Sequence, residues 1–224
     1  MIVTIDGTAS SGKSTIAKRL AQKLGFVYCN TGAIYRAMTI LILENFNEDY
    51  FNEDDFYNLV KDMSVVEGFK NGEFFITLNG KDVSGEINQH HISQAVVRYA
   101  KLPKLREVVR KIQRQIATSN DSVVEGRDIG TVVFPNAEVK FFMSASVEVR
   151  AQRRKADYDK KGEHISLSKV IEEIKERDRL DMEREISPLK PALDAIIVDN
   201  SGNDVDKMVD YLASIVKKYK TTKN

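Results

Sequence analysis

Apolar residues in the first 45 positions alternate between two spacings. Residues 2–5 form a short β-branched run, and residues 26–29 form a second apolar run, so both predict strands. Apolar positions recur at helical spacing over 16–24, where Gly25 is placed to cap the helix, and again over 33–45. Strand, helix, strand and helix in this order predict a parallel sheet with right-handed crossovers.

The alternation is interrupted after residue 46. Residues 47–55 are acidic and predict irregular structure. The run Phe74–Leu78 leads into Asn79-Gly80, which is a hairpin signal, so residues 62–90 predict a small β insertion. The pattern then predicts helical structure over 93–118 with a break near Pro103, strands at 122–124, 139–143 and 195–199, and helices over 146–158, 168–185 and 205–219.

Composition narrows the class of protein. The 224 residues are 42% hydrophobic and carry a net charge of +1, which gives no sign of a nucleic-acid or membrane partner. The single cysteine, Cys29, cannot form an intrachain disulfide. No segment reads as a signal peptide or a membrane span. We therefore expect a cytoplasmic monomer.

The segment between the first strand and the first helix carries a phosphate-binding motif. Gly7-Thr8-Ala9-Ser10-Ser11-Gly12-Lys13-Ser14 matches GxxxxGKS at each fixed position. Glycines let backbone N–H groups surround a phosphate, and the helix N-terminus adds a positive dipole. We expect Lys13 to reach the β- and γ-phosphates of ATP and Ser14 to contact Mg²⁺. The motif predicts a P-loop core but does not identify the acceptor.

A kinase for a phosphorylated acceptor needs a second set of cations, and arginine suits this role because it binds phosphate with two hydrogen bonds. Arg36 and Arg127 lie at element ends, where ligands bind in open α/β sheets. Arg177, Asp181 and Arg184 follow helical spacing, so they are expected on one helix face. A solvated salt-bridge helix is the alternative interpretation of this charged stretch.

Three further arginines, Arg150, Arg153 and Arg154, precede a polar break at 159–163. A helix, a polar loop and another helix are typical of a lid that closes over substrates and excludes water. We expect the lid at about 155–166, within a kinase core formed by 1–61 and 91–224.

These motifs together resemble the bacterial cytidylate kinases nearly from end to end. The discriminating parts are Thr31-Gly32-Ala33-Ile34-Tyr35-Arg36, Asp82-Val83-Ser84, Glu125-Gly126-Arg127-Asp128-Ile129-Gly130-Thr131-Val132-Val133, and Glu176-Arg177-Asp178 with Asp181 and Arg184. The resemblance implies a P-loop NTPase-type α/β fold with a lid and an enlarged nucleotide-binding region. It also implies transfer of the γ-phosphoryl group of ATP to CMP or dCMP.

The resemblance also implies roles for individual residues. Catalysis would involve Lys13, Arg127, Arg154 and Arg184. ATP would be bound by residues Gly7, Thr8, Ala9, Ser10, Ser11, Gly12, Lys13, Ser14, Thr15 and Arg153. The acceptor would be bound by Thr31, Tyr35, Arg36, Arg106, Arg127, Asp128, Arg177, Asp181 and Arg184. Within that set, Arg36, Arg127 and Arg184 would hold the CMP phosphate, Arg177 and Asp181 the ribose, and Arg106 and Asp128 the cytosine.

The chain departs from the family pattern at three positions. Asn30 and Glu125 stand where the family usually has aspartate, and Val97 stands where many members have serine. Two other functions remain open from the residues alone. One is a kinase for another small acceptor, such as a different nucleotide, shikimate or dephospho-coenzyme A. The other is an ATP-dependent switch or nucleic-acid-binding module, which the balanced charge disfavours.

Overall fold

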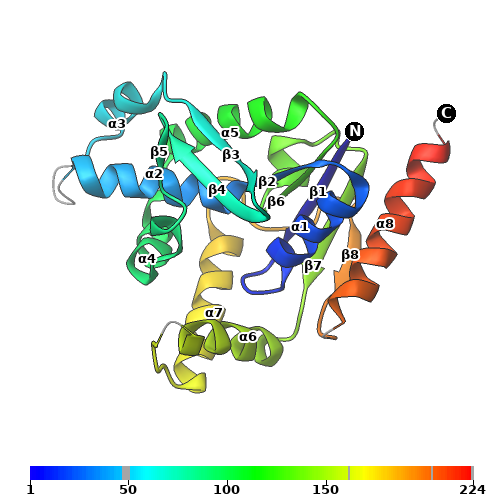
Figure 1. Ribbon diagram of the computed structural model, residues 1–224. Coiled ribbons are helices and arrows are strands. Elements are labelled where there is room, and N and C mark those ends of the chain that lie inside the picture. Colours follow the sequence, from blue (N-terminus) through cyan, green and yellow to red (C-terminus); the bar gives the residue numbers. More distant parts are fainter. Residues whose placement is uncertain (47–50, 161, 203, 223–224) are drawn as a thin grey trace. The chain divides into compact units, whose positions relative to one another are not determined.

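The computed structural model describes residues 1–46, 51–160, 162–202 and 204–222 (Figure 1). The chain forms two compact units. The first comprises Met1–Phe26 with Asp121–Asn224, and the second comprises Val27–Asn120.

The first unit is built on parallel strands. β1 (Ile2–Gly7), β6 (Ser122–Gly126), β7 (Val139–Ser144) and β8 (Ile196–Asp199) lie in the order β6-β1-β7-β8. Asp6 in β1 is opposite Gly126 of β6 on one side and Phe142 of β7 on the other. Because the strands are parallel, their carboxyl ends meet at one edge, and the loops that follow them converge there.

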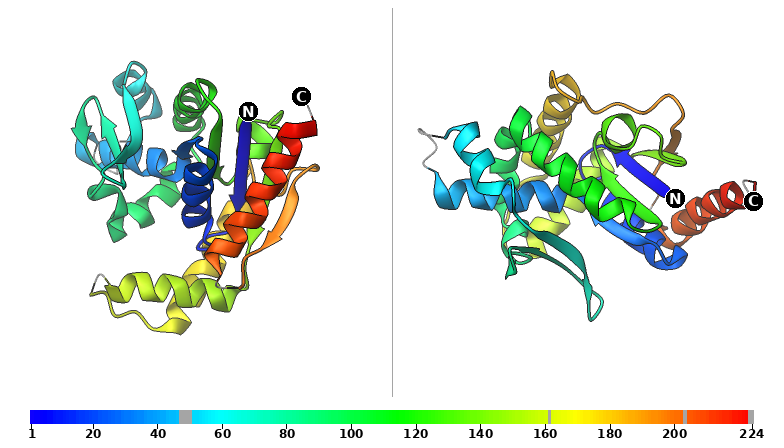
Figure 2. Two further views of the ribbon diagram at one scale, coloured as in Figure 1. Left: turned by 45° about the vertical axis from the view of Figure 1, so that its right-hand side comes forward. Right: turned by 90° about the horizontal axis from the view of Figure 1, so that it is seen from above.

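The α-helices of the described part of this unit are α1 (Lys13–Leu24), α6 (Val147–Lys160), α7 (Leu167–Glu183) and α8 (Val205–Thr222). Helices α1 and α8 pack against each other (Figure 2), as do α6 and α7. The core beneath α1 includes Ile5, Ile16 and Leu20, which are inaccessible to solvent. Each such side chain contributes about 1.5–3 kcal/mol by burial. Gly25 ends α1 in the left-handed conformation that its position predicts.

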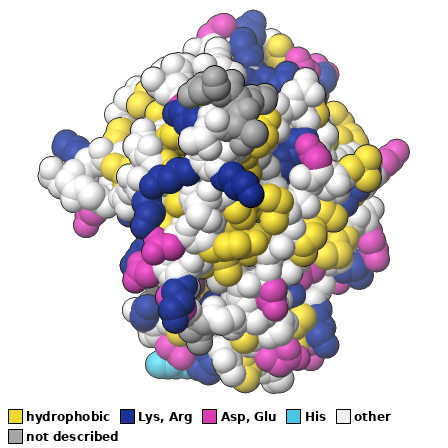
Figure 3. All heavy atoms as spheres, turned by 90° about the vertical axis from the view of Figure 1, so that its right-hand side faces the viewer, with side chains coloured by type: hydrophobic (Ala, Val, Ile, Leu, Met, Phe, Trp, Pro, Cys, Tyr) yellow, Lys and Arg dark blue, Asp and Glu magenta, His cyan; other side chains and the backbone are white. Residues whose placement is uncertain are grey.

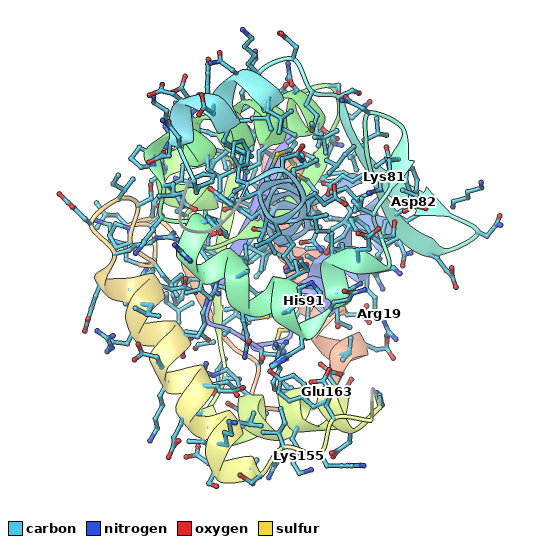
Figure 4. All side chains as sticks on the ribbon, turned by 90° about the vertical axis from the view of Figure 1, so that its left-hand side faces the viewer. Arg19, Lys81, Asp82, His91, Lys155 and Glu163 are labelled. Carbon is cyan, nitrogen blue, oxygen red and sulfur yellow. The ribbon has the colours of Figure 1, made fainter. Side chains whose placement is uncertain are left out.

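The pair α6 and α7 has a small core of its own, formed by Ala151, Tyr158, Val170 and Ile174. The N-cap of α7 is Ser166, whose hydroxyl accepts a hydrogen bond from the Lys169 N–H. Lys155 lies in the last part of α6, and Glu163 lies in the connection between the two helices (Figure 4). Residue 161, inside the predicted lid, lies outside the described residues.

The second unit combines helices with a small antiparallel sheet. Its helices are α2 (Thr31–Asn45), α3 (Glu53–Val60), the 3₁₀ turn η2 (Glu86–Asn88), α4 (His90–Tyr99) and α5 (Pro103–Thr118). Its strands are β2 (Val27–Asn30), β3 (Val65–Lys70), β4 (Glu73–Leu78) and β5 (Lys81–Asp82), of which β3, β4 and β5 form the antiparallel sheet. Pro103 takes the first position of α5, where its missing N–H costs no hydrogen bond.

The predicted hairpin is confirmed. Asn79 and Gly80 turn the chain from β4 into β5, and both have positive φ angles. Asn71 and Gly72 make a second such turn between β3 and β4. Lys81 and Asp82 mark β5 in Figure 4. Residues 65–82 thus form a three-stranded meander.

Several predicted boundaries are wrong. Part of the acidic stretch 47–55 begins helix α3, because Asn52 caps the helix and Glu53, Asp54 and Asp55 favour its positive end; residues 47–50 lie outside the described part. Helix α7 ends at Glu183, two residues early. Residues 129–133, in the middle of the most discriminating motif, form a π-helical turn (η3, Ile129–Val133) that no pattern indicated.

Hydrophobic side chains gather on the face of the first unit that carries β8 and α8 (Figure 3). Ile197 of β8, Tyr211 of α8 and Leu193, just before β8, are exposed large apolar residues. Among the described residues, no helix combines the length and the hydropathy needed to cross a bilayer.

Candidate active site

The phosphate loop joins β1 to α1, and its two fixed glycines are required by the backbone. Gly7 has a φ of 152°, and a Cβ there would lie 1.8 Å from the Met143 carbonyl oxygen. Gly12 has a φ of 91° and is the N-cap of α1, where a Cβ would lie 2.5 Å from Asn200 Nδ2. No described side chain caps α1. The first N–H groups of the helix are therefore suited to bind an anion.

Lys13 lies inside the loop and is buried. Its ammonium group donates to the Thr8 carbonyl oxygen at 2.6 Å and to Ser11 Oγ at 3.3 Å. Burial lowers the pKa of Lys13 to about 7, and repulsion from Arg127 acts in the same direction. A lysine held by the loop's own oxygen atoms is placed to transfer those hydrogen bonds to a phosphate.

Ser14 and Glu125 form the next contact of the site. The Ser14 hydroxyl donates to Glu125 Oε2 at 2.9 Å, and the glutamate side chain is buried near the carboxyl end of β6. A hydroxyl and a carboxylate together offer the hard oxygen atoms that Mg²⁺ prefers. In the sequence, Glu125 stands out only as a departure from the family pattern. Its place at the end of a strand was the signal available for including it.

Asp181 is the centre of an arginine cluster. Its carboxylate accepts from Arg127 Nε at 2.9 Å and from Arg177 Nε at 3.2 Å, and it lies 4.0 Å from Arg184 Nη1. Burial alone would raise the pKa of Asp181, but the attraction of Arg127 and Arg177 outweighs it and lowers the pKa to about 2. Three arginines around one carboxylate leave excess positive charge, which suits an anionic ligand.

Arg184 joins this cluster from beyond the helix. Helix α7 ends at Glu183, so Arg184 has extended backbone, and its guanidinium donates to the Ser187 carbonyl oxygen at 2.5 Å. It also lies 3.6 Å from the buried carboxylate of Asp128. The predicted grouping of Arg177, Asp181 and Arg184 is therefore present, although the last of them is outside the helix.

Asp6 holds the turn that follows Arg127 and Asp128. Its carboxylate accepts from the Ile129 N–H at 2.9 Å and from the Gly130 N–H at 2.7 Å. Burial raises the pKa of Asp6 to about 6, although these two hydrogen bonds oppose the rise. Asp6 lies directly before the phosphate loop, and no sequence motif indicated its role.

The three arginines of α6 have different surroundings. Arg150 is buried and pairs with Asp178. Arg153 donates to the carbonyl oxygens of Ser11 at 3.3 Å, Asn200 at 2.8 Å and Gly202 at 3.1 Å. Arg154 lies over the ring of Tyr158, with 4.7 Å between the guanidinium carbon and the ring centroid. Arg150 and Arg153 thus contact the phosphate loop itself.

The remaining predicted residues belong to the second unit. Thr31 is buried at the start of α2, which Asn30 caps by accepting from the Ala33 N–H at 3.0 Å. A Cβ at position 32 would lie 3.2 Å from Arg36 Nη1, so glycine there leaves room for this arginine.

Arg106 and Tyr35 contact each other in the same unit. The Arg106 guanidinium lies 5.7 Å from the Tyr35 ring centroid and donates to the Ala100 carbonyl oxygen at 2.9 Å. Arg106 is almost inaccessible to solvent. Ligand contacts by Thr31, Tyr35, Arg36 and Arg106 remain predictions.

Known proteins resemble this chain along nearly its whole length. The family model described as cytidylate kinase matches residues 3–218. A cytidylate kinase of Lactobacillus johnsonii is 43% identical over 97% of this chain and 94% of its own length. The cytidylate kinase of Carboxydothermus hydrogenoformans is also 43% identical, over 96% of this chain and 97% of its own.

A solved structure adds support for the fold. A shikimate kinase from Bacteroides thetaiotaomicron is 11% identical over 97% of this chain and 98% of its own, with a TM-score of 0.52. At that identity the likeness concerns the fold alone, and it confirms the predicted α/β kinase architecture. The end-to-end sequence similarity decides between the families, and the chain belongs to the cytidylate kinases.

Proposed function

We propose that this protein transfers the γ-phosphoryl group of ATP to CMP, and to dCMP, giving ADP with CDP or dCDP. The observation that carries the proposal is the Asp181 cluster, in which Arg127, Arg177 and Arg184 surround one carboxylate. An acceptor that is itself a phosphate needs such a site, because two bound anions repel each other.

The donor side of the site follows from the phosphate loop. Backbone N–H groups of Gly7–Ser14 surround the triphosphate, and Lys13 exchanges its bonds to Thr8 and Ser11 for bonds to phosphate oxygens. Phosphoryl transfer depends mainly on positioning and on stabilising the charge of the transferred group. Lys13 and the arginines supply that charge in a buried setting, where it acts more strongly than in water.

Ser14 and Glu125 fit a magnesium site. Their oxygens lie 2.9 Å apart at the start of α1, where the β- and γ-phosphates of ATP would lie. When bound with ATP, Mg²⁺ would neutralise part of the phosphate charge. Two protein oxygens suffice, because Mg²⁺ usually keeps several waters and takes further ligands from the phosphates.

On the acceptor side, Arg127 and Arg184 bind the CMP phosphate, and Arg177 and Asp181 bind the ribose. Asp128 accepts a hydrogen bond from the cytosine amino group. We propose that Arg36 adds to phosphate binding, that Arg106 adds to base recognition, and that Thr31 and Tyr35 contact the same nucleotide. Arg153 and Arg154 act on the ATP side.

A panel of acceptors tests this function. ADP formation is measured with ATP, Mg²⁺ and each of CMP, dCMP, UMP, AMP and GMP, with shikimate included for the alternative class of kinase. The proposal expects the highest kcat/KM for CMP or dCMP. A higher kcat/KM for any other acceptor would refute it.

The segment of about 155–166 is proposed as the lid of the kinase core. Hydrogen exchange of this segment should slow when an ATP analogue and CMP are both present. With CMP alone, the exchange rate should be the same as in buffer. We also propose a cytoplasmic monomer without nucleic-acid or membrane partners. Sedimentation at several protein concentrations, with and without RNA or anionic vesicles, tests that proposal.

A further inference from the structure

Arg150 of α6 and Asp178 of α7 form a buried ion pair, with Arg150 Nη1 2.5 Å from Asp178 Oδ2. The arginine also donates through Nε to the Ala145 carbonyl oxygen at 2.8 Å. Removing one partner of a buried ion pair leaves an uncompensated charge, whereas replacing both with apolar groups is often tolerated. A buried pair of this kind is therefore weak evidence for a purely stabilising role.

Both members of the pair also contact one residue of the phosphate loop. Asp178 Oδ1 accepts from the Ala9 N–H at 3.1 Å, and Arg150 Nη1 donates to the Ala9 carbonyl oxygen at 3.1 Å. Ala9 lies in the irregular part of the motif, followed by Ser10 with a φ of 56°. Non-glycine residues rarely adopt such a φ, so the surroundings must hold the loop in this shape.

The neighbouring residue Ser11 is held similarly. Its carbonyl oxygen accepts from Asn200 Nδ2 at 2.8 Å and from Arg153 at 3.3 Å. The backbone of the loop is thus held at Ala9 from α6 and α7, and at Ser11 from α6 and the end of β8.

The same two helices have other roles in the site. Helix α7 carries Asp178 directly after Arg177, and Asp181 one turn later, so one helix contacts the phosphate loop and carries acceptor residues. A shift of α7 relative to α6 would pull on the Ala9 peptide through two hydrogen bonds. The loop shape and the position of these helices are therefore mechanically linked.

We propose that Arg150 and Asp178 are positioning residues that hold the Ala9 peptide and thereby keep the phosphate loop in its ATP-binding shape. The inference rests on the proposed function only in taking ATP as the ligand of the loop. Neither residue needs to contact ATP.

The test compares single and double variants. Asp178→Asn keeps an acceptor for Ala9 but turns an amide toward Arg150. Arg150→Met removes the donor to Ala9. We expect each to weaken binding of a non-hydrolysable ATP analogue at least about tenfold, measured by calorimetry, because hydrogen bonds to charged groups are stronger than those between neutral groups. Hydrogen exchange of residues 8–12 should accelerate in both.

The double variant Arg150→Met/Asp178→Leu separates positioning from stability. It leaves no unpaired buried charge, so its thermal stability should return toward that of the wild type while its ATP affinity stays low. Arg179→Met on the same helix is the matched control. Arg179 pairs with Glu176 at 2.8 Å and with Glu183 at 2.6 Å on the exposed side, and its loss should change ATP affinity less than about twofold.

Recovery of ATP affinity together with stability in the double variant would overturn the proposal, as would wild-type affinity in a folded Asp178→Asn. Failure of the proposed function is distinguishable. If the wild type binds ATP but does not phosphorylate CMP, the acceptor assignment fails and the binding comparison still decides the role of the pair.

Discussion

The Ser14 hydroxyl donates to the Glu125 carboxylate across 2.9 Å, so a residue of the phosphate loop is paired with the strand end beside it. This contact makes Glu125 part of the proposed magnesium site. Replacing Glu125 by glutamine removes the charge but keeps the size of the side chain. We expect the Mg²⁺ concentration for half-maximal activity to rise about tenfold or more, the range found when groups around a metal site are removed.

Glu138→Gln is the matched control for Glu125→Gln. Glu138 also accepts a hydrogen bond from β1, at the Ile2 N–H 2.8 Å away, but at the opposite end of the strand. Its substitution should leave the Mg²⁺ dependence unchanged. An unchanged Mg²⁺ requirement in a folded Glu125→Gln variant would remove Glu125 from the metal site.

Lys13 should contribute mainly to the rate of transfer. Lys13→Ala is expected to lower kcat by on the order of 10²-fold or more, because the lysine stabilises charge on the transferred group. Arg19→Ala, an exposed basic residue of the same helix that pairs with Asp206, serves as the control and should have little effect. Single-turnover kinetics with a thermal melt of each variant would make the comparison. Near-wild-type turnover in folded Lys13→Ala would contradict the phosphate-loop assignment.

The lowered pKa of Lys13 predicts proton uptake on nucleotide binding. With a pKa of about 7 in the nucleotide-free protein, most Lys13 side chains are neutral at pH 8. Phosphate oxygens favour the ammonium form, so ATP binding at pH 8 should take up close to one proton. Calorimetry in two buffers of different ionisation enthalpy measures this number, and Lys13→Ala should abolish it. Equal apparent binding enthalpies in both buffers for the wild type would refute the prediction.

The lowered pKa of Asp181 predicts part of the decrease in the free energy of unfolding at acidic pH. Its pKa is about 2 in the folded protein and 3.8 when unperturbed, so its contribution to stability is present above pH 4 and is lost as the pH falls toward 2. The contribution is on the order of 2 kcal/mol. Asp181→Asn should flatten the change in unfolding free energy between pH 4 and pH 2, measured in urea. Exposed Glu176→Gln is the control, and the same slope in both variants would rule out this role of Asp181.

Sequence patterns predicted the contacts whose partners are close along the chain. The phosphate loop is contiguous, and the pairing of Arg177 with Asp181 follows from one helical turn. Sequence patterns did not predict the contact between Ser14 and Glu125, which are 111 positions apart, or the contact between Ala9 and Asp178, which are 169 positions apart. Such contacts depend on strand order and helix packing, which periodicity does not determine.

The errors in local structure have a related cause. The acidic stretch 47–55 predicts irregular structure, yet negative side chains also stabilise the first turn of a helix once a cap such as Asn52 is present. The π-helical turn at 129–133 is held by Asp6 of β1, whose carboxylate accepts hydrogen bonds from the N–H groups of Ile129 and Gly130. The spacing of hydrophobic residues reveals neither the capping of α3 by Asn52 nor the hydrogen bonds from Asp6.

Asp128 should determine the choice between cytosine and uracil. Cytosine has an amino group where uracil has a carbonyl, so a carboxylate accepts a hydrogen bond from the first and repels the second. A charged hydrogen bond is worth about 1.5–3 kcal/mol, and an unpaired buried group adds a penalty. Val97 offers no hydroxyl for a further contact with the base. We expect kcat/KM to favour CMP over UMP by at least about tenfold, or 1.4 kcal/mol.

Asp128→Asn tests this assignment, because an amide can turn its amino group toward the uracil carbonyl. The CMP-to-UMP ratio should narrow, while Arg127 and Arg184 still bind the phosphate and preserve part of the total activity. The loss of the Asp128 charge beside Arg184, 3.6 Å away, would also act on phosphate affinity, but equally for both nucleotides, so it cancels in the ratio. Arg184→Lys provides the opposite control, with lower activity toward CMP and UMP and an unchanged ratio. An unchanged ratio in Asp128→Asn, or wild-type enzyme that uses UMP as well as CMP, would mean that the base is recognised elsewhere.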